Sequence, residues 1–240
     1  MSKAKYDSRR KVTASNLRRL ADVLVRKGIC TDPSALFSAA SQCIIEKPDG
    51  ISSWGYDISN LIFRFDPPSG TIPKTAKNFR VEFSLRVRGN FGHDETDQFT
   101  ELAIDLEKYI EVENGAELKT AWHFDKHIGV EGEAIGEVHP LYHLQFGGNK
   151  LTECHENLGS MFLSDAPRLM YPPMDGILAI DFILSNYAGL VWNDLRVDGE
   201  YINLVKPAYD SLWKPYFESI ASSWANPSMS NNLLLCPHIC

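Results

Sequence analysis

The strongest constraint on the fold lies in residues 79–88, where apolar and polar side chains alternate without interruption. One parity carries Phe79, Val81, Phe83, Leu85 and Val87, and the other carries Arg80, Glu82, Ser84, Arg86 and Arg88. Successive side chains of a strand point to opposite faces of a sheet, so this segment predicts a β-strand that is buried on one face and wet on the other. The chain must therefore build a sheet and cover one side of it.

Two further segments repeat this alternation. Residues 61–65 alternate up to a loop at 66–70 that is rich in proline and glycine. Residues 139–147 predict another strand. Its apolar positions are Tyr142, Leu144 and Phe146, and its other face carries His139, His143 and Gln145.

Residues 99–126 predict a hairpin, although a helix over 99–110 also fits the pattern. Leu102, Ile104 and Leu106 share one parity, and Trp122 and Phe124 follow the turn at Glu113-Asn114-Gly115. A two-residue turn would set these aromatic residues against charged ones. A three-residue loop with Gly115 in the left-handed region sets Trp122 opposite Leu106 and Phe124 opposite Ile104. Burial favours the three-residue loop.

This register has a consequence for the polar face. Asp105 falls beside His123, Glu101 falls beside His127, and Asp125 lies between the two histidines. Histidine suits acid–base chemistry because its pKa lies near neutrality, and a neighbouring carboxylate orients its ring. We therefore take His123, Asp125, His127, His143 and Asp105 as candidate catalytic residues. The alternative is a solvated sheet face with incidental Asp–His pairs.

A divalent metal is a candidate cofactor, but the spacing restricts how it could bind. His123 and His127, like His139 and His143, are four residues apart on a strand, which separates them by roughly 13 Å. One ion cannot bind both members of such a pair. A site would have to form across strands, for example from Asp105, His123 and His143, a mixed N/O set that zinc accepts.

Helices are expected at both ends of the chain. The first covers about 15–27, and the second starts at Asp32-Pro33 with an apolar stripe of Leu36, Phe37, Ala40 and Ile44. A third covers 174–187 and contains Asp181, which we expect to be a hydrogen-bonded core group. The last covers about 201–224, where Pro207 and Pro215 should kink or divide it.

These elements predict a single α+β domain over 1–240 with a mainly antiparallel central sheet. It comprises an N-terminal helical pair (1–48), a β-rich core (58–150), C-terminal helices packed on one face of the sheet (171–226), and a loose tail (227–240). The length and the 44% hydrophobic content suit one such core. No 18-residue apolar run or secretory signal is present, and the five cysteines lack zinc-ribbon spacing. A cytoplasmic protein without membrane contact is expected.

The charge is unevenly distributed. Residues 1–28 contain nine basic and two acidic residues, a balance of +7, which leaves −14 for the rest of a chain of net charge −7. Such a segment is either a basic arm for a polyanion or a solvated helix that docks on its own acidic body, and the latter is favoured.

Arg86 and Arg88 are candidate substrate-binding residues, because guanidinium groups bind phosphate through two N–H groups. They could instead be surface arginines that form ion pairs with nearby acidic residues. Together these features predict a hydrolase acting on a phosphodiester, either a nucleic acid or a nucleotide, contacted by Arg86, Arg88 and the basic N-terminal region. The acidic remainder of the chain counts against broad nucleic-acid binding. Two other functions fit: a non-catalytic subunit of a cytosolic assembly that binds its partner through the C-terminal helix, and a small-ligand sensor.

Overall fold

The computed structural model describes residues 2–45, 50–71, 73–91, 97–126, 140–147, 151 and 169–225. These residues form a six-stranded sheet in which strand order follows chain order and every neighbouring pair is antiparallel. The strands are β1 (Ser53–Phe65), β2 (Lys77–Asn90), β3 (Phe99–Glu111), β4 (Glu117–Lys126), β5 (Tyr142–Phe146) and β6 (Leu169–Met170).

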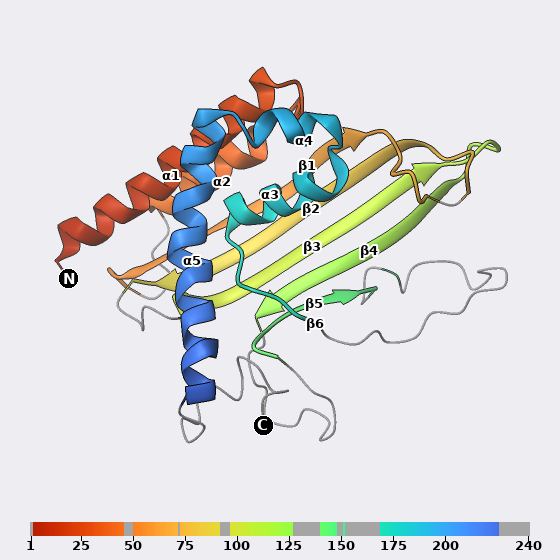
Figure 1. The fold of residues 1–240 in the computed structure, drawn as a ribbon. Helices are drawn as coiled ribbons and strands as arrows, with labels where there is room; N and C mark the ends of the chain where they lie inside the picture. Colours follow the sequence, from red (N-terminus) through yellow and green to blue (C-terminus); the bar gives the residue numbers. More distant parts are fainter. Residues whose placement is uncertain are drawn as a thin grey trace.

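The helices form a layer on one face of this sheet (Figure 1). They are α1 (Lys3–Arg26), α2 (Ser34–Ile45), α3 (Gly176–Tyr187), α4 (Leu190–Leu195) and α5 (Gly199–Ala225). α2 packs on the edge strand β1, and α1 packs on α2, α3 and α5. The expected α+β class, with helices from both ends of the chain beside an antiparallel sheet, is confirmed.

The alternation in β2 has the predicted effect. All five apolar side chains of 79–87 are buried, and they join one hydrophobic core with residues of α1, α3 and α5. Burial of such apolar area is the main favourable term in folding. The apolar face of the sheet therefore points to the helices, and the opposite parity forms a second face, which we call the polar face.

The β3–β4 hairpin has the predicted register. Leu106 pairs with Trp122, Ile104 with Phe124, and Asp105 with His123, so residues 99–111 are a strand and not a helix. The Val112 N–H donates to Ala116 O at 2.9 Å, which closes a three-residue loop. Gly115 has φ +76° in this loop, as the register argument requires.

The N-terminal helices differ from expectation. α1 begins at Lys3, about twelve residues before the predicted start, because Tyr6, Arg10 and Ala14 continue its buried stripe. Because Arg10 is charged, the sequence pattern did not indicate that the buried stripe extends to the start of the helix. In α2, Ala39 and Cys43 are buried, whereas Phe37 and Ile44 are 40% and 39% exposed, so those two stripe residues were wrongly assigned.

The sheet also extends beyond the predicted limits. β1 begins at Ser53, and a bulge interrupts its pairing with β2 between Ile58 and Leu61, where Asn60 has φ +52°. β6 lies outside the expected β-rich range of 58–150. The short helix α4 was not predicted.

The C-terminal helix was expected to be kinked or divided at its prolines. α5 is one continuous helix that contains both Pro207 and Pro215, so the prolines do not divide it. No helix in the described ranges is long and apolar enough to cross a bilayer. The predicted tail, residues 227–240, lies outside the described residues.

Asp181 is the buried, hydrogen-bonded core group that was expected. Its two carboxylate oxygens accept hydrogen bonds from the hydroxyls of Tyr201 at 2.9 Å and Tyr209 at 2.8 Å. These contacts join α3 to α5. Burial raises the pKa of the Asp181 carboxyl, and the two hydrogen bonds act in the opposite direction.

Candidate functional site

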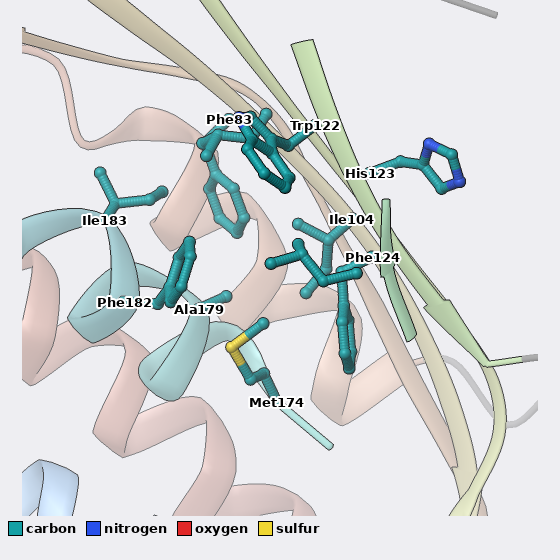
Figure 2. Close-up of a pocket in the computed structure, with 11 residues that line it drawn as sticks. Phe83, Ile104, Trp122, His123, Phe124, Met174, Ala179, Phe182 and Ile183 are labelled. Carbon is teal, nitrogen blue, oxygen red and sulfur yellow. The ribbon is translucent and has the colours of Figure 1, made fainter. Parts of the chain in front are cut away.

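The two faces of β4 carry different chemistry. Trp122 and Phe124 point into the core beside α3, whereas His123 points away from it on the far side of the strand (Figure 2). A cavity of about 10 Å³ lies between these aromatic residues and α3. It has apolar walls and room for about one water molecule, so it is a packing gap and not a ligand site. The candidate site is therefore on the polar face.

Three side chains of β4 and β5 meet on the polar face. His123 and Asp125 are two residues apart on β4, and His143 pairs with Asp125 across the two strands. Asp125 Oδ1 lies 3.0 Å from His143 Nε2, and Asp125 Oδ2 lies 3.8 Å from His123 Nε2. One donor atom from each residue lies within 4.8 Å of the other two. We call His123, Asp125 and His143 the HDH cluster.

The hydrogen bonding of His143 sets the chemistry of the HDH cluster. His143 is 4% exposed, and its Nδ1 lies 3.2 Å from the carbonyl oxygen of Pro140. A carbonyl only accepts, so Nδ1 carries the hydrogen. In neutral His143 the Nε2 lone pair then lies beside Oδ1 of Asp125. Two acceptors this close repel each other unless a proton or a metal ion lies between them.

Asp125 supplies the second indication of a cation. Its Oδ1 is buried and, within the described part of the chain, has no hydrogen-bond partner of normal geometry, although His143 Nε2 is so close. Burying a carboxylate oxygen without a partner costs roughly 1–3 kcal/mol or more. Two imidazole nitrogens and one carboxylate fit Zn²⁺, and they leave a fourth position open for water or substrate. The donors present therefore suit a divalent metal ion.

The predicted site residues separate into three groups. His123, Asp125 and His143 come together; Asp105 lies beside His123 in register but is not one of the three donors. The expected cross-strand metal set thus differs in its carboxylate, which is Asp125 and not Asp105. His127, together with His139, lies outside the described residues.

Arg86 and Arg88 have different environments although they share a face. Arg88 donates to both carboxylate oxygens of Asp57, at 2.8 and 3.1 Å, and to the backbone oxygens of Tyr56 and Val87. Its side chain is 18% exposed. This arginine holds β1 to β2, which removes it from the predicted phosphate contacts.

Arg86 is the guanidinium that solvent can reach. Its side chain is 61% exposed, and its nearest carboxylates, Asp57 and Glu101, are each 3.8 Å away. Cross-strand pairing places Arg86, Ala103, Asp125 and His143 in one row over four strands. Ala103, which lies between Arg86 and Asp125 in this row, is small and exposed.

No protein-family model matches the chain, and searches of curated proteins and of solved structures return no match. The function is therefore argued from the chemistry of the site alone.

The C-terminal helix, which was predicted to bind a partner, carries aromatic residues in different environments. Trp213 donates its indole N–H to Pro173 O at 3.0 Å and packs against Tyr171 and Tyr209. It belongs to the contact between α5 and the segment before α3, so it is not an exposed anchor. Phe217, one turn further, is 49% exposed. The side chain of Trp224 lies outside the described residues.

The sequence contained a signal that would have placed Asp125 opposite His143. Pairing the apolar residues Trp122 with Phe146 and Phe124 with Leu144 would have set Asp125 opposite His143, as the structure does. The Pro140 carbonyl had no such signal, because backbone contacts depend on the local path of the chain before β5.

Proposed function

We propose that the polar face is a metal-assisted hydrolytic site for phosphodiesters. The observation that carries the proposal is the HDH cluster, in which the Asp125 carboxylate lies between two imidazoles and its buried Oδ1 makes no hydrogen bond of normal geometry to any described residue. A divalent cation bound there would satisfy that oxygen. It would also make a bound water molecule acidic enough to lose a proton near neutral pH.

The residues of this chain then have separate tasks. His123, Asp125 and His143 hold the cation, and Pro140 orients the His143 ring. Arg86 binds the non-bridging oxygens of the phosphate above Ala103. Asp105, the cross-strand neighbour of His123, accepts the proton of the attacking water. As the water oxygen bonds to phosphorus, the opposite P–O bond breaks and the leaving oxygen takes a proton from solvent.

The surrounding charges support a role for a cation. Asp57, Glu101, Asp105 and Asp125 lie on the polar face close to Arg86 or the HDH cluster. Arg88 already pairs with Asp57, which leaves Glu101, Asp105 and Asp125. Carboxylates repel a phosphate diester, and the guanidinium of Arg86 cannot neutralise all three. A bound divalent ion adds two positive charges where the scissile phosphate would lie.

A second candidate follows from the identity of the donors. Two histidines and one carboxylate also bind Fe(II) in non-haem oxygenases. Oxygen-dependent oxidation is therefore the alternative activity of the HDH cluster. The nearby Arg86 would then bind an acidic co-substrate.

The test uses the full chain, stripped with a chelator and reloaded with Zn²⁺, Mn²⁺, Mg²⁺ or Fe²⁺. Turnover of bis(p-nitrophenyl) phosphate should appear with one of these ions. Asp125→Asn should lower it at least about 100-fold. The melting temperature should change little, because the Asp125 side chain is 37% exposed.

The matched control is Asp210→Asn, which changes a carboxylate that is 60% exposed on α5 and should leave turnover unchanged. If no ion gives turnover, or if Asp125→Asn has no effect on it, the hydrolytic assignment is wrong. Oxygen consumption with Fe²⁺ that Asp125→Asn abolishes would favour the oxygenase instead.

A further inference from the structure

A row of cations lies along the outer surface of α1. Lys5, Lys11, Arg18 and Arg19 fall within one arc of the helix, opposite the buried stripe that contains Leu17. Three of these side chains are exposed and that of Arg19 is half-buried. We call these four residues the basic face of α1.

The basic face of α1 contains one carboxylate, the exposed Asp22, beside its four cations. None of its four residues makes an ion pair with a carboxylate in the described ranges. The contrast lies at the end of the same helix, where Arg26 pairs with Glu200 at 2.9 Å and Lys27 pairs with Asp198 at 3.0 Å. Among the described residues, the ion pairs that join α1 to acidic residues of other segments thus lie at its C-terminal end, and the favoured interpretation of the basic segment holds for that end.

The dimensions of the basic face match a nucleic-acid backbone. Lys5 to Arg19 spans fourteen residues, or about 21 Å of helix. Phosphates of one strand recur about every 3.4 Å in a duplex, so several of them lie within this length. Ser8 and Ser15 share the arc, and their hydroxyls can also donate to phosphate oxygens.

An anionic membrane fits this surface less well. An interfacial helix needs a broad apolar face toward the lipid. The outward-facing apolar residues of α1 are Val12 and Val25, which are 56% and 47% exposed and almost four turns apart. The buried stripe of α1 is already occupied by the core.

The location of α1 distinguishes a polymer from a single nucleotide. α1 belongs to the helical layer (Figure 1), whereas His123 of the HDH cluster points away from that layer on the far side of the sheet (Figure 2). A helix and a sheet together are roughly 20 Å thick, which is longer than a mononucleotide can bridge. A strand of nucleic acid can contact both surfaces at once.

We infer that the basic face of α1 is a second binding site for single-stranded nucleic acid, and that the substrate of the polar face is a polymer. The choice of nucleic acid over other polyanions rests on the phosphodiester function proposed above. Binding to α1 itself can be measured whether or not the protein is a hydrolase.

The experiment measures fluorescence anisotropy of a labelled 30-nucleotide RNA and DNA of mixed sequence at several salt concentrations. Four phosphate contacts predict a slope of about −3 for log K against log salt. The triple variant Lys11→Ala, Arg18→Ala and Arg19→Ala should weaken binding at least about tenfold at low salt and reduce the slope by about 2. Alanine favours helix, so α1 should persist.

The control variant removes three exposed lysines elsewhere, at Lys74, Lys206 and Lys214, and should bind like the wild type. Equal loss in both variants would mean that only net charge matters, which overturns the inference. So would unchanged binding in the α1 variant, or tighter binding to polyglutamate or to anionic vesicles than to nucleic acid.

The two proposals fail separately. Turnover of the small diester by the α1 variant should match the wild type, since α1 is remote from the polar face. If the α1 variant loses nucleic-acid binding and no condition gives hydrolysis, the α1 site is supported and the hydrolytic function is wrong. If the protein hydrolyses the small diester but does not bind the polymer, the hydrolytic function is supported and the α1 site is wrong.

Discussion

Arg88 depends on the absence of a side chain at residue 55. A Cβ added to Gly55 would lie 2.4 Å from Arg88 Cδ and 3.0 Å from Val87 O. Gly55→Ala should therefore displace Arg88, break its two hydrogen bonds to Asp57, and lower the free energy of unfolding by about 1–3 kcal/mol. Urea denaturation measures this loss.

The control for this prediction is Gly70→Ala, since a Cβ at Gly70 meets nothing within 4 Å. Its unfolding free energy should match the wild type. Combining Gly55→Ala with Arg88→Ala should cost less than the sum of the two single changes, because the clash disappears with the long side chain. Additive losses would show that Gly55 does not act through Arg88.

Asp181 predicts a pH dependence of stability. Burial raises the pKa of the Asp181 carboxyl. The stability that the protonated carboxyl contributes is therefore fully present below the unfolded pKa of about 3.9, and it is lost as pH rises through the folded pKa. Asp181→Asn stays neutral and can still bond both Tyr201 and Tyr209. Relative to wild type, this variant should gain stability as pH rises from about 4 to 7.

Urea denaturation at intervals across this range checks the sign. The exposed Asp210→Asn serves as the comparison and should track the wild type. A difference between Asp181→Asn and wild type that is constant with pH, or that grows in favour of the wild type, would contradict the raised pKa.

At the scale of elements, the β3–β4 hairpin depends on one backbone conformation. Gly115 has φ +76°, and nothing lies within 4 Å of a Cβ built there, so a substitution tests the backbone alone. Gly115→Ala should lower the free energy of unfolding by about 1–2 kcal/mol, the cost of a left-handed L-residue.

Gly115→Asn should lose less, because asparagine tolerates the left-handed region better than alanine does. The Asn114 side chain should continue to accept from the Ala116 N–H at 3.0 Å in both variants. Equal losses for alanine and asparagine in thermal unfolding would count against this account of the loop.

At the scale of the whole molecule, a buried arginine ties the helical layer to the sheet. Arg10 of α1 is 1% exposed. It donates to Ser53 O at 2.6 Å, to Ile51 O at 2.9 Å and to Asp7 at 2.7 Å. A lysine has no planar fork and cannot reach all three acceptors. Arg10→Lys should therefore lower the free energy of unfolding by about 2–3 kcal/mol.

The comparison variant is Arg18→Lys, which lies on the exposed side of the same helix and should leave stability unchanged. Hydrogen exchange of the first three turns of α1 should quicken in Arg10→Lys and not in Arg18→Lys. Unaltered exchange would mean that other contacts, such as the stacking of Tyr6 on Phe91, hold this end of the helix.

The sequence by itself determined the class of fold, the apolar face of the sheet and the register of the β3–β4 hairpin. These features depend on local alternation and on the turn at Gly115, which act between residues close in the chain. Leu106 faces Trp122 because any slip would bury charge. Asp181 could likewise be identified as a core group from its place in an apolar helix.

Only the tertiary structure decided how residues of like parity differ. Arg86 and Arg88 have the same pattern in the sequence, yet the missing side chain at Gly55, the cross-strand partner of Arg88, gives Arg88 a place against Asp57, whereas Arg86 is 61% exposed. His143 is buried where a wet face was expected, and its partners come from another strand and from the Pro140 carbonyl. Such contacts join segments far apart in the chain or depend on an irregular backbone path. The periodicity of the sequence predicts neither kind of contact.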